Sequence, residues 1–180
     1  AVYGGIVAAV WDGERAAHLR IEPPEALTTL IAVPAYELPT HQAREALPRT
    51  YSREDTVFNL SRAALLTAAL SNGRLDLLAD AMRDRLHQPY RAPLVPGLDK
   101  VLSEAPLHGA LGAALSGAGP TAILFVDKHT DRKEELESFL HAAMGAHGPV
   151  ELLWLPPSGT GLELAVRSAP GSGGRTGGAQ

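Results

Sequence analysis

The 180 residues are enough for one globular domain, and their 45% apolar and 20% charged content is ordinary for such a domain. The net charge of −4 and the 5% aromatic content are the opposite of what a nucleic-acid-binding groove needs, so we expect no nucleic-acid partner. The absence of cysteine excludes disulfides and thiolate chemistry, and no apolar run reaches the ~18 residues of a membrane span, so we expect a cytoplasmic protein with no membrane partner.

The first part of the chain predicts a β-hairpin followed by a buried strand. An Asp-Gly pair at 12–13 separates an apolar run that ends at Trp11 from the alternating segment 18–21, which is the signal of a hairpin. Residues 27–33 are a short apolar run with β-branched side chains that stops at Pro34, so they predict a buried strand.

Five later segments have the apolar spacing and the end signals of helices. They are residues 40–47, 52–72, 75–86, 97–105 and 131–144. Thr40 is placed to cap the first of them, and Ser52 opens the second with a capping-box-like pattern. The third is expected to stop before Pro89, which leaves Arg91 just past a helix end.

Four further apolar segments predict strands, at residues 109–115, 121–126, 151–155 and 162–166. Strands interleaved with helices, and hairpins at the beginning and the end, predict an α+β fold in which helices pack on one face of a mostly antiparallel sheet. Residues 171–180 are rich in Gly and Ser and hold almost no apolar side chain, so we expect a disordered tail over 169–180.

Two arginines are candidates for binding an anionic ligand. Arg91 follows a Gln-Pro-Tyr sequence, and proline fixes φ and removes an amide donor, so the guanidinium stands on a stiff segment suited to gripping a carboxylate. Thr40 and Arg44 lie four residues apart and share one face of the first helix. From spacing alone, a surface arginine and a capped helix are the simpler interpretations.

The loop Ser116-Gly117-Ala118-Gly119 joins two of the predicted strands. Glycine adds no Cβ and tolerates positive φ, so the backbone of such a loop can pass very close to another group. Taken by itself, the pattern is also that of a tight turn.

No catalytic residue and no metal site is assigned from the spacing. The seven histidines have no metal-ligand pattern, and no Ser-His-Asp arrangement can be argued. Asp84 and His87 are close enough in sequence to Arg91 to order its segment, although Asp84 could equally be a helix surface charge. Asn59 and Arg62 are interpreted as packing or surface groups.

Three of these segments together resemble the homoserine kinases, a branch of the GHMP small-molecule kinase family. They are residues 40–48 (THQAREALP), 84–91 (DRLHQPYR) and 115–121 (LSGAGPT). The resemblance is to the C-terminal half of those enzymes. It implies a ferredoxin-like GHMP-kinase C-terminal domain over 27–168, preceded at 1–26 by the end of an N-terminal kinase domain.

The resemblance also implies roles. Thr40, Arg44 and Arg91 would be substrate-binding, with the two arginines on the carboxylate of L-homoserine. Residues Ser116 to Gly119 would be the family's glycine motif, which sits against the nucleotide-phosphate loop. The implied enzyme uses ATP and Mg²⁺ to phosphorylate the homoserine hydroxyl in threonine biosynthesis, and the resemblance allows a homodimer.

Two family motifs are missing from the sequence. These are the Pro-x-x-x-Gly-Leu-Gly-Ser-Ser phosphate loop, whose amides open a helix and favour phosphate, and a His-Pro-Asp-Asn segment. We therefore expect a fragment without its N-terminal half, which would carry the catalytic groups. Such a fragment is expected to hold no cofactor and to be inactive alone.

Two alternatives stay open. The parent protein could be another GHMP kinase, acting on mevalonate or a sugar, although an uncharged substrate would not need both Arg44 and Arg91. The chain could also be a free-standing α+β regulatory module that binds an amino acid without catalysis.

Overall fold

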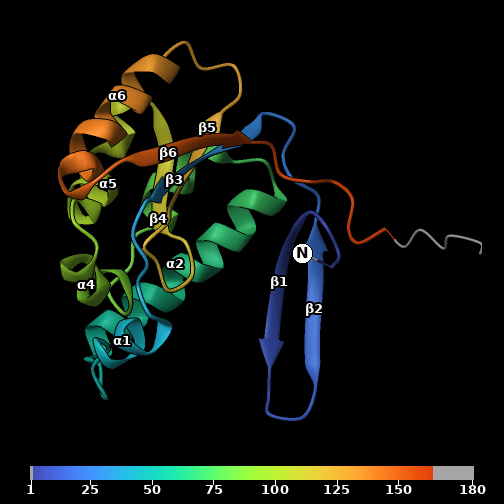
Figure 1. Cartoon of the computed structure of the whole chain (residues 1–180). Helices are drawn as coiled ribbons and strands as arrows, with labels where there is room; N and C mark the ends of the chain where they lie inside the picture. Colours follow the sequence, from blue (N-terminus) through green and yellow to red (C-terminus); the bar gives the residue numbers. More distant parts are fainter. Residues whose placement is uncertain (1, 164–180) are drawn as a thin grey trace, which may run out of the picture.

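The chain opens with the predicted antiparallel hairpin (Figure 1), and the computed structural model describes residues 2–163. The hairpin strands are β1 (Ile6–Trp11) and β2 (Ala16–Ile21). Asp12 closes the turn, because its Oδ1 accepts hydrogen bonds from the amides of Glu14 (2.9 Å) and Arg15 (2.7 Å).

The hairpin projects from the body of the molecule (Figure 1), and it exposes apolar side chains. Val10, Trp11 and Leu19 are each about two-thirds exposed, whereas Ile21 at the base is buried. Within the described residues, little of the hairpin's apolar surface is therefore packed against the rest of the chain.

Four strands form the second sheet. They are β3 (Leu27–Pro34), β4 (Ala110–Leu115), β5 (Ala122–Asp127) and β6 (Val150–Leu155). Their order is β4-β5-β3-β6 and every neighbouring pair is antiparallel. Leu30 on β3 lies opposite Leu124 on β5 and Trp154 on β6, so β3 and β5 form the buried centre of the sheet.

The helices are shorter and more broken than the sequence indicates. They are α1 (Thr40–Glu45), α2 (Arg53–Ser71), α3 (Leu78–Ala81), α4 (Gln88–Arg91), α5 (Leu98–Glu104) and α6 (Lys133–Met144). Short 3₁₀ turns lie at Leu75–Leu77, Ala92–Leu94, Ala105–His108 and Gly145–His147.

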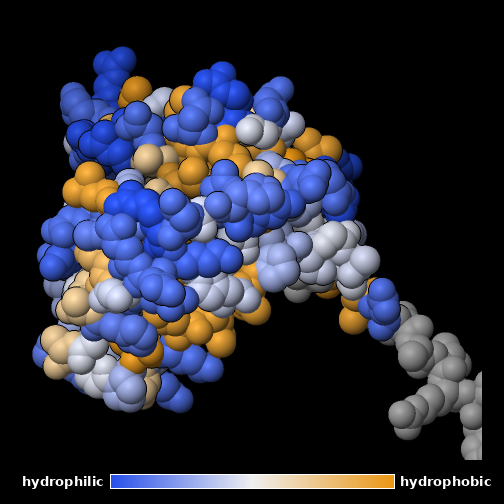
Figure 2. Space-filling model, turned by 90° about the horizontal axis from the view of Figure 1, so that it is seen from above, coloured by the Kyte–Doolittle hydropathy of each residue, from blue (hydrophilic) through white to orange (hydrophobic). Residues whose placement is uncertain are grey.

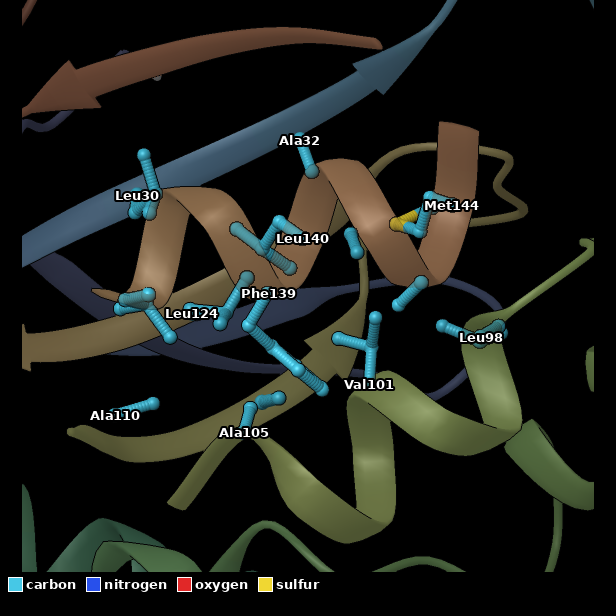
Figure 3. Packing of buried hydrophobic residues seen from close by; sticks show 14 of the residues in the cluster. Leu30, Ala32, Leu98, Val101, Ala105, Ala110, Leu124, Phe139, Leu140 and Met144 are labelled. Carbon is cyan, nitrogen blue, oxygen red and sulfur yellow. The ribbon is translucent and has the colours of Figure 1, made fainter. Parts of the chain in front are cut away.

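The main core lies between the sheet and helices α5 and α6. Successive strand residues point to opposite faces, and Leu30 and Leu124 point to the helical face. There they meet Val101 of α5 with Phe139 and Leu140 of α6 (Figure 3). All five are buried. This packing confirms the predicted α+β class with a helical layer on an antiparallel sheet.

A second, smaller buried cluster lies on the opposite face of the sheet. Leu27 and Phe125 point to that face and pack with Leu70 of α2 and Leu78 of α3. Helices therefore contact both faces of the sheet, and the expected restriction of helices to one face is wrong. Leu155 at the end of β6 is 49% exposed, and Figure 2 shows further apolar surface among hydrophilic residues on the face seen from above.

The structure supports one predicted cap and corrects the other. At α2 the Asp55 amide donates to Ser52 Oγ at 3.0 Å, as the capping-box pattern predicts. At α1 the expected Thr40 cap is wrong. Pro39 occupies the capping position, Thr40 is already the first helical residue, and no side chain caps the helix.

The predicted helix over 75–86 is confirmed only as far as Ala81, as a 3₁₀ turn followed by α3, and is wrong beyond that residue. Helix α3 ends early, the chain turns, and α4 begins at Gln88 with Pro89 in its first turn, where a missing amide loses no helical bond. The physical reason is Asp84, whose carboxylate accepts backbone amides that would otherwise continue a helix. Arg91 consequently lies within a helix and not past a helix end.

Part of the expected C-terminal structure lies outside the described residues. Leu162 and Glu163 form no strand. The remainder of the predicted strand 162–166, the end of the expected domain at 168 and the expected tail 169–180 all lie beyond residue 163. Among the helices of residues 2–163, none has the length and apolar character needed to cross a membrane.

The packing of α6 predicts a contrast between two leucines. Leu140 is fully buried and Leu107 is 71% exposed. Leu140→Ala should lower the free energy of unfolding by about 2–5 kcal/mol because it leaves a cavity, and Leu107→Ala should change it by less than about 0.5 kcal/mol. Urea denaturation measures both, and equal losses would contradict the described core.

Candidate functional site

Arg91 connects the three segments that the sequence analysis singled out. Its side chain is only 8% exposed. Its Nε donates to the carbonyl oxygen of Ala43 in α1 at 3.1 Å, and its Nη1 donates to the carbonyl oxygen of Gly117 at 2.9 Å. The helix α1, the helix α4 and the glycine loop therefore meet at one guanidinium.

Asp84 fixes the turn that leads into α4. Its Oδ1 accepts from the amide of Leu86 (3.0 Å) and from Asn59 Nδ2 (2.5 Å), and its Oδ2 accepts from the amides of His87 (2.8 Å) and Gln88. Burial raises the pKa of this carboxyl, but the four hydrogen bonds outweigh burial and the net effect lowers the pKa.

Gln88 fixes α4 from its other side. The side chain is buried, and its Oε1 accepts the amide of Leu115 at 2.7 Å. Its Nε2 makes a longer bond of 3.4 Å to the carbonyl oxygen of Met82. Leu115 is the last residue of β4, so Gln88 holds α4 against the strand that leads directly into the glycine loop.

The glycine loop uses the backbone conformations that its sequence indicates. The amide of Ser116 donates to the carbonyl of Thr121 (2.8 Å), and the amide of Gly119 donates to that of Ser116 (3.0 Å). Gly117 and Gly119 have φ of +59° and +91°, which glycine adopts at little cost. A Cβ on Gly117 would meet nothing within 4 Å in the described residues, so its outer side is open.

Thr40 and Arg44 lie on α1, the helix whose Ala43 carbonyl holds Arg91. Both side chains are exposed. The ion pairs among residues 2–163 include neither Arg44 nor Arg91. The structure thus brings two arginine-bearing helices together without placing a carboxylate on either guanidinium.

The free donors of Arg91 define what the arrangement can bind. A guanidinium has five N–H groups, and Arg91 uses two of them within the described part of the chain. The remaining donors suit a planar anion such as a carboxylate, and Arg44 adds a second positive charge on α1. No group of three or more His, Asp or Glu side chains in residues 2–163 is placed to hold a metal ion.

A cavity of about 670 Å³ is lined in part by α4, but it is separate from the site at Arg91. Gln88, Leu102 and Gly112 are among its lining residues, and neither the two arginines nor the glycine loop lines it. Its charged side chains are of both signs, so the lining selects no ligand charge. We place the candidate site at Arg91 because the sequence motifs converge there.

Sequence reasoning missed two residues of this arrangement. The interpretation of Asn59 as a packing or surface group is wrong, because its amide bonds Asp84 and the amide of Arg85 (2.8 Å). Arg62 does pack, with its guanidinium over the Phe58 ring at 3.3 Å. A polar asparagine in the interior of a helix was the available signal for Asn59. Gln88 carried no signal of its own.

The chain is similar to known proteins in sequence and in fold. Residues 66–146 match the family described as GHMP kinases C terminal. The homoserine kinase of Deinococcus radiodurans is 52% identical over 148 residues, which are 82% of this chain and 48% of that protein. The crystal structure of homoserine kinase from Cytophaga hutchinsonii has a TM-score of 0.80 at 25% identity, over 88% of this chain and 50% of that one.

The fold likeness extends to a kinase of another substrate. The crystal structure of L. major mevalonate kinase in complex with R-mevalonate has a TM-score of 0.61 at 17% identity, over 87% of this chain and 50% of that one, which shows the shared fold alone. The chain spans about half the length of the curated relatives that it matches.

The lowered pKa of Asp84 predicts a pH-dependent contribution to stability. A carboxyl ordinarily titrates near about 3.9, and one with a lowered folded pKa stabilises the fold above that pH and loses the effect as the pH falls through the folded value. Asp84→Asn should therefore cost about 1.5–3 kcal/mol at pH 7, and the difference from wild type should shrink at pH 3. Urea midpoints at both pH values measure it.

Asp99→Asn is the matched control for that experiment. Asp99 is exposed, and its carboxylate accepts no hydrogen bond among the described residues. Its substitution should change stability by less than about 0.5 kcal/mol at either pH. A loss for Asp84→Asn that is the same at pH 7 and pH 3 would show that its charge is not what holds the turn.

Proposed function

We propose that the chain is the C-terminal part of a homoserine kinase, since residues 66–146 match the family described as GHMP kinases C terminal. The enzyme would transfer the γ-phosphoryl group of ATP to the side-chain hydroxyl of L-homoserine, a cytoplasmic step of threonine biosynthesis. The observation that carries the proposal is the buried Arg91, which joins α1, α4 and the glycine loop and keeps donors free.

In this proposal Arg91 and Arg44 hold the carboxylate of homoserine. A planar guanidinium can make two parallel hydrogen bonds to a carboxylate, so it fixes the direction of the substrate as well as its charge. Thr40 lies one helical turn before Arg44 and would support that arginine or the amino-acid backbone. Selectivity for an amino acid over a neutral alcohol follows from the two positive charges.

The contribution of this part to catalysis is positioning. Phosphoryl transfer depends mostly on alignment of the reacting groups and on stabilisation of charge. A substrate held by its carboxylate on two short, anchored helices would present its hydroxyl in one orientation. ATP with Mg²⁺ supplies the phosphoryl group, and we place their main binding groups in the segment that precedes this chain in the parent enzyme.

Two features of the chain support a preceding half. Gly117 leaves open space beside the loop backbone, which suits the close approach of another segment. The hairpin of β1 and β2 exposes Val10, Trp11 and Leu19, and we assign residues 1–26 to the end of the N-terminal kinase domain. The matched residues make up only 48% of the Deinococcus radiodurans protein, which fits the same assignment.

The first test asks whether Arg91 binds the carboxylate of homoserine. In the full-length enzyme, Arg91→Lys keeps the charge but loses the planar fork, so kcat/KM for homoserine should fall about ten- to a hundredfold, the equivalent of roughly 1.5–3 kcal/mol. The loss should be much smaller for 3-aminopropan-1-ol, which is homoserine without its carboxylate. Steady-state kinetics with both substrates measures the difference.

Arg74→Lys is the control, because Arg74 is exposed and pairs with Asp76 away from the site. It should leave both substrates unaffected. Equal losses for both substrates in Arg91→Lys would show that Arg91 does not bind the carboxylate. The same pair of assays on Arg44→Lys separates a clamp of two arginines from a single one.

The second test concerns the division of the enzyme into this part, which binds homoserine, and a preceding part, which carries the catalytic groups. The 180-residue chain should form no O-phosphohomoserine from ATP, because the groups that stabilise the phosphoryl charge contribute several orders of magnitude in rate. The protein extended to the length of its relatives should be active. Kinase-level turnover by the 180 residues alone would refute this division, and an extended protein that binds homoserine without turnover would favour the regulatory module.

A further inference from the structure

The helix that carries Arg91 is too short to hold a buried guanidinium by itself. Helix α4 spans four residues, Gln88–Arg91, and isolated helices of that length are unstable in water. Its orientation must therefore come from contacts with longer elements. Among the described residues, α2 and β4 supply contacts to the segment that begins α4. The contact from α2 runs through Asn59.

Asn59 lies on the longest helix of the described chain, α2, which has 19 residues. Its Nδ2 donates to Asp84 Oδ1 at 2.5 Å, and its Oδ1 accepts the amide of Arg85 at 2.8 Å. Asp84 in turn accepts the amides at 86, 87 and 88, the residues that lead into α4. A continuous set of hydrogen bonds thus runs from a long helix to the start of the arginine-bearing one.

We propose that Asn59 is a positioning residue, which through Asp84 sets the orientation of α4 and hence the direction of the Arg91 guanidinium. The role of Asn59 in orienting Arg91 stands on the hydrogen bonds alone. Its consequence for homoserine rests on the proposed function.

The chemistry of the position selects an amide. Asn59 must donate to a carboxylate and accept from a backbone amide at the same time, and a side-chain amide has both groups. Aspartate has the same shape and keeps the acceptor, but it would set a second carboxylate against Asp84. Alanine removes both hydrogen bonds and adds no charge.

The arginines near Asp84 contact other groups, so they do not take over the role of Asn59. Arg85 pairs with Asp55 at 3.3 Å and lies 3.9 Å from the Phe58 ring centroid, and Arg62 lies over the same ring. Neither arginine forms an ion pair with Asp84 among the described residues. The Asp84 carboxylate is therefore held by amide groups, of which the Asn59 amide is the one from α2.

The primary experiment follows the Arg91 side chain in the 180-residue chain. Its Nε–H is buried against the Ala43 carbonyl, so it should exchange slowly with solvent in an NMR experiment, and the signal that Arg91→Lys removes assigns it. Asn59→Asp should accelerate this exchange about tenfold or more, because a released contact opens more often. If Asn59→Asp does not fold, Asn59→Ala provides the same test without the added charge.

Asn72→Asp and Asn72→Ala are the matched controls on the same helix. Asn72 is exposed, and its Nδ2 bonds only the Ala68 carbonyl of α2, at 2.8 Å, in the described part of the chain. These variants should leave the Arg91 exchange rate within about twofold of wild type. Unchanged exchange in a folded Asn59 variant, or equal acceleration in the Asn72 variants, would overturn the positioning role.

A second readout separates this proposal from the proposed function. In the full-length enzyme, Asn59→Asp should raise KM for homoserine about tenfold and leave KM for ATP unchanged. Accelerated Arg91 exchange with both KM values unchanged would leave the positioning role in place and would instead contradict carboxylate binding by Arg91.

Discussion

The buried guanidinium of Arg91 is held by two backbone carbonyls, one 48 residues before it and one 26 residues after it in the chain. Removing a charge from water is costly unless its donors find acceptors. The carbonyls of Ala43 and Gly117 accept from two of the five N–H groups of the guanidinium. The other three have no acceptor among the described residues, so one constraint assembles the site and leaves donors for an anion.

The rigidity of the site comes from elements outside it. Helix α4 is one turn long, but Asn59 of α2 and Leu115 of β4 hold it through Asp84 and Gln88. Strand β4 belongs to a sheet whose central strands are buried, and α2 packs its last turn on that sheet through Leu70. The core therefore determines where Arg91 lies.

One face of the main sheet is covered by helices, whereas the hairpin and the outer side of the glycine loop are exposed. Helices α5 and α6 cover one face of the four-stranded sheet and bury Leu30 and Leu124. The hairpin of β1 and β2 exposes Trp11 and its apolar neighbours, and the loop at Gly117 is open on its outer side. Exposed apolar strands promote association. Both features fit a part of a larger protein, which agrees with the half-length coverage of the relatives.

Local patterns in the sequence were sufficient to predict the hairpin, α2 and the four strands of the main sheet. Alternation of side chains, the Ser52 cap and the turn at Asp12 depend on residues within a few positions of one another. Resemblance to a family pointed to Thr40, Arg44, Arg91 and residues 116–119 together. The break between α3 and α4 could not be predicted locally, because the Asp84 carboxylate that takes the amides is itself held by Asn59, 25 residues earlier. The tertiary structure alone decided that Arg91 is buried and that its partners are carbonyls, since backbone carbonyls are present at every residue and only the fold selects which ones an arginine reaches.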